Sequence, residues 1–215
     1  MDGIIDSPEH PVKERRVSLI PFPNIIPIAK TFFDSQENEN ILSFFEKAHS
    51  CNIDWAVNHG DSDLHLMERT EWDLYDNVNF KNSFKHIIEK RIFDAMVDVS
   101  SFPRPSKFMR FIPDYKVQMY NIWFARCKSG GYTDPHHHGL SLGCYSFVHY
   151  LKLPSKVTSL TFSNSDSSIK DRMILREGDM IVFPSNLLHW TFETEDDRCL
   201  LAGNFVWSCS IDRED

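Results

Sequence analysis

The sequence lacks the features of a secreted or membrane-bound chain. No apolar run approaches the roughly 18 residues that a membrane-spanning helix requires. The N-terminal segment MDGIIDSPEHPVKERR is polar and has no apolar core of the kind found in signal peptides. The five cysteines are an odd number and include no CxxC pair, so we expect reduced thiols rather than a disulfide framework. These absences predict a soluble cytoplasmic protein with no membrane association.

Positive charge is also in deficit. Lys and Arg number 23 against 31 Asp and Glu, which gives a formal net charge of −8. Nucleic-acid binding depends mainly on neutralising phosphates, so we expect neither a nucleic-acid partner nor a nucleobase substrate. The composition, 41% hydrophobic and 25% charged, excludes a disordered, collagen-like or coiled-coil chain. The length of 215 residues predicts one domain, at residues 17–215, after a flexible tail at residues 1–16.

The two halves of that domain differ in their hydrophobic pattern. Residues 41–48, after a candidate N-cap at Asp34 or Ser35, and residues 80–96 have the apolar spacing of helices. From Lys116 onward, six short β-rich runs are separated by turn residues, notably the Gly130–Gly131 pair. We therefore expect a mainly β protein with α, in which two or more N-terminal helices from a lead-in at residues 17–113 pack outside an antiparallel β-core at residues 114–209.

Three consecutive histidines, His136, His137 and His138, stand in the middle of the chain. Alternate residues of an extended segment point to the same side, so His136 and His138 share one face. Two imidazoles on one face supply half of a site for Fe, Zn, Cu or Ni. Two other registers stay open, Asp134 with His136 and His137 with Gly139. The alternative is a polar loop whose histidines are solvated.

Two further candidates follow the turn Glu177–Gly178–Asp179 and the apolar run MIVFP. His189 comes just after that run, where a third ligand can approach from an adjacent strand. Arg198 precedes the run CLLAGNFVW, and its guanidinium can offer two hydrogen bonds to one carboxylate. The alternatives are a hydrogen-bonded histidine and a surface arginine that pairs with Asp196 or Asp197.

The run at residues 144–150 alternates in the manner of a strand. Tyr145, Phe147 and His149 share one face, and Cys144, Ser146, Val148 and Tyr150 share the other. The sequence leaves open which of the two faces lines the interior. We interpret His149 as a hydrogen-bonded wall residue rather than a ligand.

In order, the motifs are H-x-H, a strand-rich stretch, GD-x-x-x-FPSNLLH and then Arg198. This order resembles the iron(II)- and 2-oxoglutarate-dependent oxygenases over residues 117–207, and within them the prolyl-hydroxylase-like branch that includes phage and bacterial oxygenases. The resemblance implies a double-stranded β-helix, or jelly roll, with a metal at one open end. The family's ligands are usually His-x-Asp or His-x-Glu plus a distal histidine. Here the ligands would be His136, His138 and His189, so an imidazole replaces the carboxylate, and the set can hold Fe(II) or Zn(II).

The resemblance also implies the cofactors and the reaction. Fe(II) and 2-oxoglutarate would bind, with ascorbate as an optional reductant, and Arg198 would hold the far carboxylate of 2-oxoglutarate. Asn121 or Tyr120, on the strand that leads into the site, would hydrogen-bond the cosubstrate. The expected reaction is hydroxylation of a C–H bond on a protein or peptide side chain, or on an amino acid or small metabolite.

Two other functions fit the same residues. The first is a non-catalytic jelly-roll binding or assembly module with a structural metal or none, which the missing carboxylate favours. The second is a cupin-type metalloenzyme that uses three histidines without 2-oxoglutarate. No feature of the sequence specifies an oligomeric state.

Overall fold

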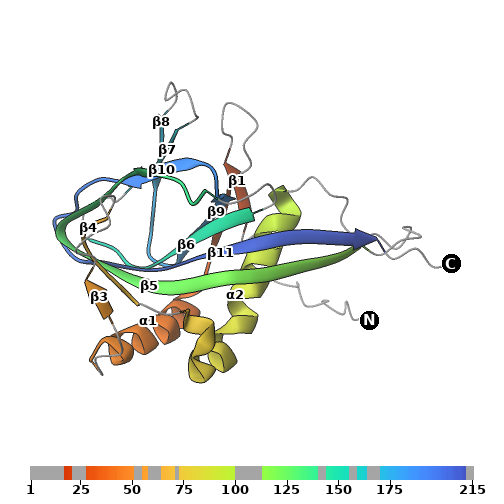
Figure 1. Cartoon of the computed structure of the whole chain (residues 1–215), viewed down its shortest axis with the longest axis horizontal. Helices are drawn as coiled ribbons and strands as arrows, with labels where there is room; N and C mark the ends of the chain where they lie inside the picture. Colours follow the sequence, from red (N-terminus) through yellow and green to blue (C-terminus); the bar gives the residue numbers. More distant parts are fainter. Residues whose placement is uncertain are drawn as a thin grey trace, which may run out of the picture.

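The computed structural model describes residues 17–20, 28–50, 55–57, 64–70, 73–99, 113–139, 144–154, 159–163 and 170–211. Within these residues the chain is mainly β, with one curled, eleven-stranded antiparallel sheet and two α-helices (Figure 1). In chain order the elements are β1 (Val17–Ile20), β2 (Ile28–Phe32), α1 (Ser35–Ser50), β3 (Trp55–Val57), β4 (Leu64–Thr70), the short 3-10 helix η1 (Leu74–Asp76), α2 (Val78–Val99), β5 (Pro113–His136), β6 (Cys144–Lys152), β7 (Ser159–Ser163), β8 (Lys170–Ile174), β9 (Asp179–Pro184), β10 (Leu188–Thr191) and β11 (Arg198–Ile211). The tail expected at residues 1–16 lies outside the described residues.

The sheet curls because β5 changes partner along its length. The strand order is β1-β2-β9-β6-β11-β5-β10-β7-β8, with β4 beside β5 and β3 beside β4. The first part of β5 runs antiparallel to β11, and its end pairs with β10 (Figure 1). Leu160 and Phe162 of β7 consequently pack with Ile181 and Phe183 of β9 in one buried cluster. The sheet therefore closes over an interior of its own, which is consistent with a jelly roll.

Both helices pack on the outer face of this sheet. Phe45 of α1 and Ile88 and Ile92 of α2 share one core with Phe124 of β5 and Leu201 of β11. These helix positions are the apolar ones whose spacing is helical, so the amphipathic faces are the faces that are buried. Neither helix combines the length and the apolarity needed to cross a membrane.

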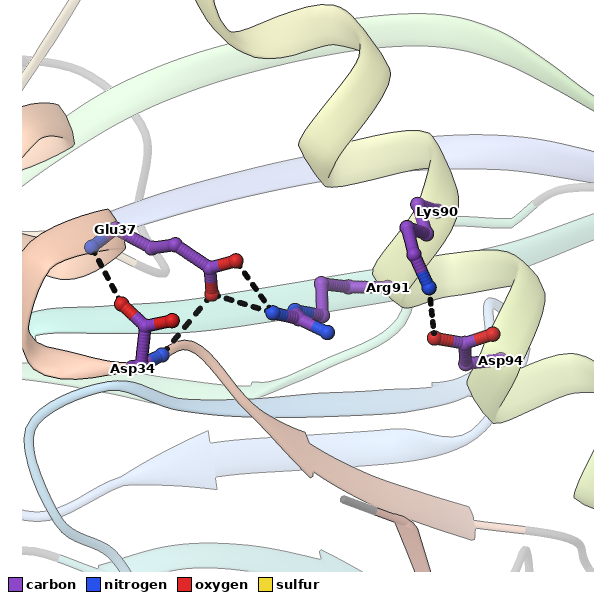
Figure 2. A network of polar contacts seen from close by, with 5 residues as sticks. All are labelled: Asp34, Glu37, Lys90, Arg91 and Asp94. Atoms are coloured by element: carbon purple, nitrogen blue, oxygen red, sulfur yellow. Dashed lines mark hydrogen bonds and ion pairs between the residues drawn. The ribbon is translucent and has the colours of Figure 1, made fainter. Parts of the chain in front are cut away.

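α1 begins at a reciprocal capping box. The Asp34 carboxylate accepts a hydrogen bond from the backbone N–H of Glu37 (2.9 Å), and the Glu37 carboxylate accepts one from the backbone N–H of Asp34 (3.0 Å; Figure 2). Arg91 of α2 also donates to Glu37, with Nη2 at 2.5 Å from each carboxylate oxygen. Arg91 is 4% exposed and lies 5.6 Å from the centroid of the Phe33 ring. Glu37 therefore caps α1 and ties it to α2.

β6 is covered on both faces, and the structure resolves which face is inside. Phe147 belongs to the core shared with the helices, and His149 Nε2 donates to Asn38 Oδ1 of α1 (2.9 Å). Val148 and Tyr150 face the interior. His149 is thus a wall residue that holds α1 against the sheet. Burial lowers its pKa to about 3, so it is neutral at physiological pH.

β9 is likewise apolar on both faces, which explains the unbroken run MIVFP. The turn before it, predicted at Glu177–Asp179, is present, and Gly178 takes a φ of 86°. A Cβ at this glycine would lie 2.9 Å from the carbonyl oxygen of Phe33. Both the backbone conformation and the close approach of the Phe33 segment therefore require glycine.

One predicted strand end and the predicted set of C-terminal strands need correction. The Gly130–Gly131 pair was expected to end a strand, but β5 continues through it to His136. Residues 128–131 interrupt the regular pairing opposite Leu66 of β4, and Gly130 bends the strand with a φ of 79° without ending it. The six predicted β-rich runs also omit β10, which has only four residues and so shows little alternation. Among the described cysteines, Cys127, Cys144 and Cys199 are buried and form no disulfide.

Candidate metal and ligand site

Three histidines meet inside the curled sheet. His136 ends β5, His138 follows it, and His189 lies in β10. The pairing of β5 with β10 puts His136 directly opposite His189, and directly paired residues share a face of the sheet. One nitrogen atom from each of the three rings lies within 4.8 Å of the other two. The arrangement has the ligand type and the spacing that a divalent transition metal needs.

Among the described residues, the hydrogen bonds of the three rings fall on Nδ1 in each and leave Nε2 free. His136 Nδ1 lies 2.7 Å from the Asp134 carbonyl oxygen, and His189 Nδ1 lies 2.9 Å from the Leu187 carbonyl oxygen. His138 Nδ1 lies 2.6 Å from Asn204 Oδ1. An oxygen acceptor at Nδ1 requires the proton there, so Nε2 carries the lone pair in all three rings.

Two of these rings are held in the neutral form that metal binding requires. Burial lowers the pKa of His189 well below its ordinary value, and the neighbouring His136 and His138 lower it further. Burial also lowers the pKa of His138, against the opposing hydrogen bond to Asn204. A neutral imidazole keeps its lone pair for a cation, so the environment favours the ligand form at physiological pH.

Arg198, at the start of β11, is fully buried with 0% exposure. Its Nη2 donates to Thr191 Oγ1 (2.9 Å), whereas Nε and Nη1 have no hydrogen-bond partner among the described residues. A buried guanidinium with open donors matches the fork geometry of a carboxylate. The surface pairing considered for Arg198 is not formed, because Asp197 pairs with Arg126 instead.

The histidines and Arg198 line one cavity of about 330 Å³. Thr191, which accepts from Arg198, lies two residues beyond His189 on the same face of β10, a step of about 7 Å in a strand. Tyr150 lines the same cavity, is fully buried, and has no partner for its hydroxyl among the described residues. Burial raises the pKa of Tyr150, so its hydroxyl stays protonated and can donate. The complete lining is Met67, Arg69, Asn121, Trp123, Ala125, Thr133, His136, His138, Val148, Tyr150, Leu160, His189, Thr191, Arg198, Leu200, Ala202 and Asn204.

The charge of the cavity opposes that of the whole chain. The formal net charge is −8, yet the described lining residues include Arg69 and Arg198 and no Asp or Glu. A low-dielectric cavity that carries one sign of charge concentrates ligands of the opposite sign. The charge of the lining therefore favours an anionic ligand over a cationic one.

Asn121 and Tyr120, the two candidates on β5, have different positions. Asn121 lines the cavity, and its Oδ1 accepts from Asn204 Nδ2 (2.9 Å). Tyr120 is 58% exposed and is not part of the lining, so we leave it out of the proposed site. The physical reason is a β-bulge: Asn204 pairs with Asn121 and Phe205 pairs with Met119, which leaves Tyr120 as the extra, unpaired residue.

Among the described residues, neither of the other two candidate ligand registers, Asp134 with His136 or His137 with Gly139, forms part of a metal-binding group. His137 is exposed, and its Nδ1 accepts from the backbone N–H of Gly139 (2.9 Å). Asp134 contacts His136 through its backbone carbonyl, and its carboxylate is not part of the three-residue group. Among the described residues, the group is formed by His136, His138 and His189.

Several lining residues gave no usable signal in the sequence. Thr191, Met67 and Arg69 lie on β10 and β4, two strands that the hydrophobic pattern did not reveal. Tyr150 was visible as one of two alternating faces, without a means to choose between them. Asn204 lies inside the apolar run CLLAGNFVW. A polar residue within such a run is unusual, and this was the only signal in the sequence that could have marked Asn204 as part of the site.

Comparison of the sequence with protein-family models and with curated proteins yields no match. Comparison of the structure does yield matches. A prolyl-4-hydroxylase from Pseudomonas putida superposes with a TM-score of 0.60 at 13% identity, over 84% of this chain and 92% of that chain. The epimerase SnoN from nogalamycin biosynthesis, which is non-heme and α-ketoglutarate dependent, superposes with a TM-score of 0.62 at 12% identity, over 83% and 76%.

A third solved structure is HygX from Streptomyces hygroscopicus, with nickel, 2-oxoglutarate and hygromycin B bound. It superposes with a TM-score of 0.57 at 16% identity, over 85% of this chain and 83% of that chain. At these identities the likeness establishes a shared fold. The mainly β architecture expected from the sequence is confirmed, and the curled antiparallel sheet is consistent with the expected jelly roll.

Proposed function

We propose that this chain, which has the fold of the Fe(II)- and 2-oxoglutarate-dependent oxygenases, also catalyses their type of reaction, the hydroxylation of a C–H bond. The observation that carries the proposal is the common cavity of Arg198 and the three histidines. The histidines offer a divalent metal three neutral nitrogens, and the buried guanidinium has open donors for a carboxylate. 2-Oxoglutarate has a chelating keto acid at one end and a carboxylate at the other, so it fits both.

His136, His138 and His189 would hold the iron through Nε2. When bound, iron(II), 2-oxoglutarate and O2 supply the oxidising chemistry, in which the cosubstrate becomes succinate and CO2 and the substrate C–H bond becomes C–OH. Three neutral ligands leave the full charge of a divalent metal uncompensated. A dianionic cosubstrate supplies the negative charge that a carboxylate ligand would otherwise provide.

Arg198 would bind and orient the far carboxylate. Its Nη2 is fixed by Thr191, whose own hydroxyl lies 3.1 Å from Thr133 Oγ1. The guanidinium is therefore held before the ligand arrives, which lowers the entropic cost of binding. The Tyr150 hydroxyl is the second donor that we assign to this carboxylate. We place Asn121 at the opposite end of the cavity, near His138, because Asn121 is hydrogen-bonded to Asn204 and Asn204 contacts His138.

The substrate would lie against the wall formed by Met67 and Arg69 of β4 and Trp123 of β5. The Trp123 ring lies 6.3 Å from the His138 ring, so a group that stacks on Trp123 would be held close to the metal ligands. We propose a peptide side chain or a small molecule as the substrate. Structural neighbours of both kinds exist: a prolyl hydroxylase from Trichoplax adhaerens is in complex with a peptide fragment, and HygX binds hygromycin B.

One observation favours a second function. The ligand set has three imidazoles and no carboxylate, and three histidines plus water also suit zinc. A non-catalytic module with a structural zinc would use the same histidines. It would leave the open donors of Arg198 and Tyr150 unexplained, so we rank it second.

The decisive experiment measures 2-oxoglutarate binding. The full chain is loaded with Ni(II), which replaces iron without turnover, and is titrated with 2-oxoglutarate by calorimetry. We expect Arg198→Met to weaken 2-oxoglutarate about 100-fold, since removal of a buried charged partner costs about 2–5 kcal/mol. The control Arg126→Met removes an arginine from the Asp197 ion pair and should leave this affinity unchanged.

A second assay measures turnover. With Fe(II), ascorbate and 2-oxoglutarate under air, the wild-type protein should form succinate slowly even without a substrate. If Ni(II)-loaded protein does not bind 2-oxoglutarate, the oxygenase proposal fails. Zinc in the purified protein, together with a melting temperature lowered by His189→Ala, would then support the structural module. Metal-dependent activity that needs no 2-oxoglutarate and survives Arg198→Met would instead indicate a cupin-type enzyme.

A further inference from the structure

A buried polar cluster lies directly behind His138. We define the Asn204 cluster as Asn121, Ser146, Ser185 and Asn204. Asn204 Oδ1 lies 2.6 Å from His138 Nδ1 and accepts from Ser146 Oγ (2.7 Å). Ser146 Oγ also lies 2.9 Å from His138 Nδ1 and 2.9 Å from Ser185 Oγ. Both serines are fully buried, and Asn204 is 7% exposed.

His138 differs from the other two histidines in what holds it. His136 and His189 lie within paired strands, and their Nδ1 atoms contact backbone carbonyls, which no side-chain substitution removes. His138 lies beyond the end of β5, and its Nδ1 contacts are side chains of β6 and β11. Its backbone N–H donates to the Ser185 carbonyl (2.9 Å), which fixes the main chain and leaves ring rotation free.

The direction of the Asn204 amide decides which His138 nitrogen is free. Asn204 Nδ2 donates to Asn121 Oδ1 (2.9 Å), so the amide oxygen faces His138 and accepts its Nδ1 proton. The reversed amide would donate to Nδ1 and move the ring proton to Nε2, where no lone pair would remain for a metal. A bulge at Tyr120, opposite Asn204 and Phe205, keeps Asn121 and Asn204 as direct partners.

We propose that Asn204 is a positioning residue that makes His138 a metal ligand, by holding the ring at Nδ1 and keeping the lone pair of Nε2 directed at the site. The inference rests on the proposed function, because it assumes that the three histidines bind a metal. It goes beyond that function, since it identifies the group that orients the one ligand standing where the family usually has a carboxylate. Ser146 supports Asn204 by donating to the same oxygen.

The experiment measures affinity for Co(II) and Ni(II), each alone, at one fixed pH with the full chain. Asn204→Leu removes the acceptor, and we expect affinity to fall about 10- to 100-fold, as for other partners of metal-bound histidine. Asn204→Asp keeps an acceptor that cannot be reversed, so affinity should equal or exceed that of the wild type. The visible absorption of bound Co(II) should change in Asn204→Leu and be retained in Asn204→Asp.

Asn38→Leu is the matched control. Asn38 is another buried asparagine that contacts a histidine, but its partners are His149 and the Leu151 carbonyl, away from the cavity. Its loss should lower the melting temperature without changing metal affinity. If Asn204→Leu does not fold, Asn204→Asp and Ser146→Ala decide the question, and Ser146→Ala should weaken metal binding less than tenfold.

The inference is overturned if Asn204→Leu binds metal as tightly as the wild type, or if Asn204→Asp loses as much affinity as Asn204→Leu. Its failure is distinct from failure of the proposed function. If only the inference fails, the wild-type protein still binds Ni(II) and 2-oxoglutarate, and only the role of Asn204 is lost. If the proposed function fails, the wild-type protein itself binds no 2-oxoglutarate.

Discussion

His136 and His189 are direct partners across β5 and β10, with ring centroids 4.3 Å apart. Their proximity is a consequence of strand register, which hydrogen bonds of the sheet maintain with or without a ligand. Two of the three candidate ligands are therefore preorganised by the fold. The third, His138, depends on side chains, which is why the Asn204 cluster matters to the site.

His189→Ala should abolish tight metal binding. It removes one of three nitrogens from the group, so the affinity for Ni(II) should fall by more than the roughly 100-fold that loss of an outer partner produces. His137→Ala is the control, because this neighbour is exposed and outside the group. Calorimetric titration with Ni(II) measures both variants. Equal losses in both would show that the run binds metal nonspecifically.

Tyr150→Phe should have effects of opposite sign on stability and on binding. Without a cosubstrate, removal of a buried hydroxyl that lacks a partner should raise the free energy of unfolding by about 1 kcal/mol. In Ni(II)-loaded protein, loss of a donor to a carboxylate should weaken 2-oxoglutarate at least about tenfold. Tyr145→Phe, on the outer face of β6, should do neither. Unchanged 2-oxoglutarate affinity in Tyr150→Phe would remove this residue from the site.

His149 should make the protein less stable in acid. Its folded-state pKa is about 3, below the ordinary value of 6.5, because the ring is fully buried. Between these values the unfolded chain binds a proton that the folded chain does not. The contribution of neutral His149 to the free energy of unfolding is therefore fully present above pH 6.5. It is lost as the pH falls toward 3, at about 1.4 kcal/mol per pH unit.

The measurement compares urea unfolding of the wild type and His149→Gln from pH 7 to pH 4. The difference in the free energy of unfolding should shrink in acid, because the variant lacks this titration. His86→Gln, at an exposed position of α2, is the control and should follow the wild-type curve. Parallel curves for the wild type and His149→Gln would contradict the low pKa.

Glu37→Gln should destabilise the fold more than Asp94→Asn. The first change leaves Arg91 without its carboxylate partner (Figure 2), and the side chains of Arg91 and Glu37 are only 5% and 19% exposed. We expect a loss of about 2 kcal/mol in the free energy of unfolding, somewhat less than for a fully buried pair. The pair Lys90–Asp94 lies at 55% and 36% exposure, so Asp94→Asn should cost less than about 0.5 kcal/mol. Similar losses in chemical denaturation would argue that Glu37 acts only as a cap.

The sequence predicted the elements that depend on local patterns. The spacing of apolar residues in α1 and α2, a cap at Asp34 or Ser35 and the turn at Gly178 follow from short-range geometry, because each involves residues within a few positions of one another. The motif order also identified His136, His138, His189 and Arg198, all of which line one cavity. β4 and β10 were not predicted, since β10 has only four residues and β4 lies in a polar segment without clear alternation.

What the sequence by itself determined is which side chains alternate along each strand, and which residue types are able to bind a metal and a carboxylate. Alternation defines two faces of β6, but only the packing of α1 and α2 on Phe147 and His149 decided that Tyr150 faces the cavity. A bulge separated Asn121 from Tyr120, and strand register put His136 opposite His189 and Asn204 behind His138. These outcomes belong to tertiary structure because they depend on pairings between segments far apart in the chain, which no local pattern encodes.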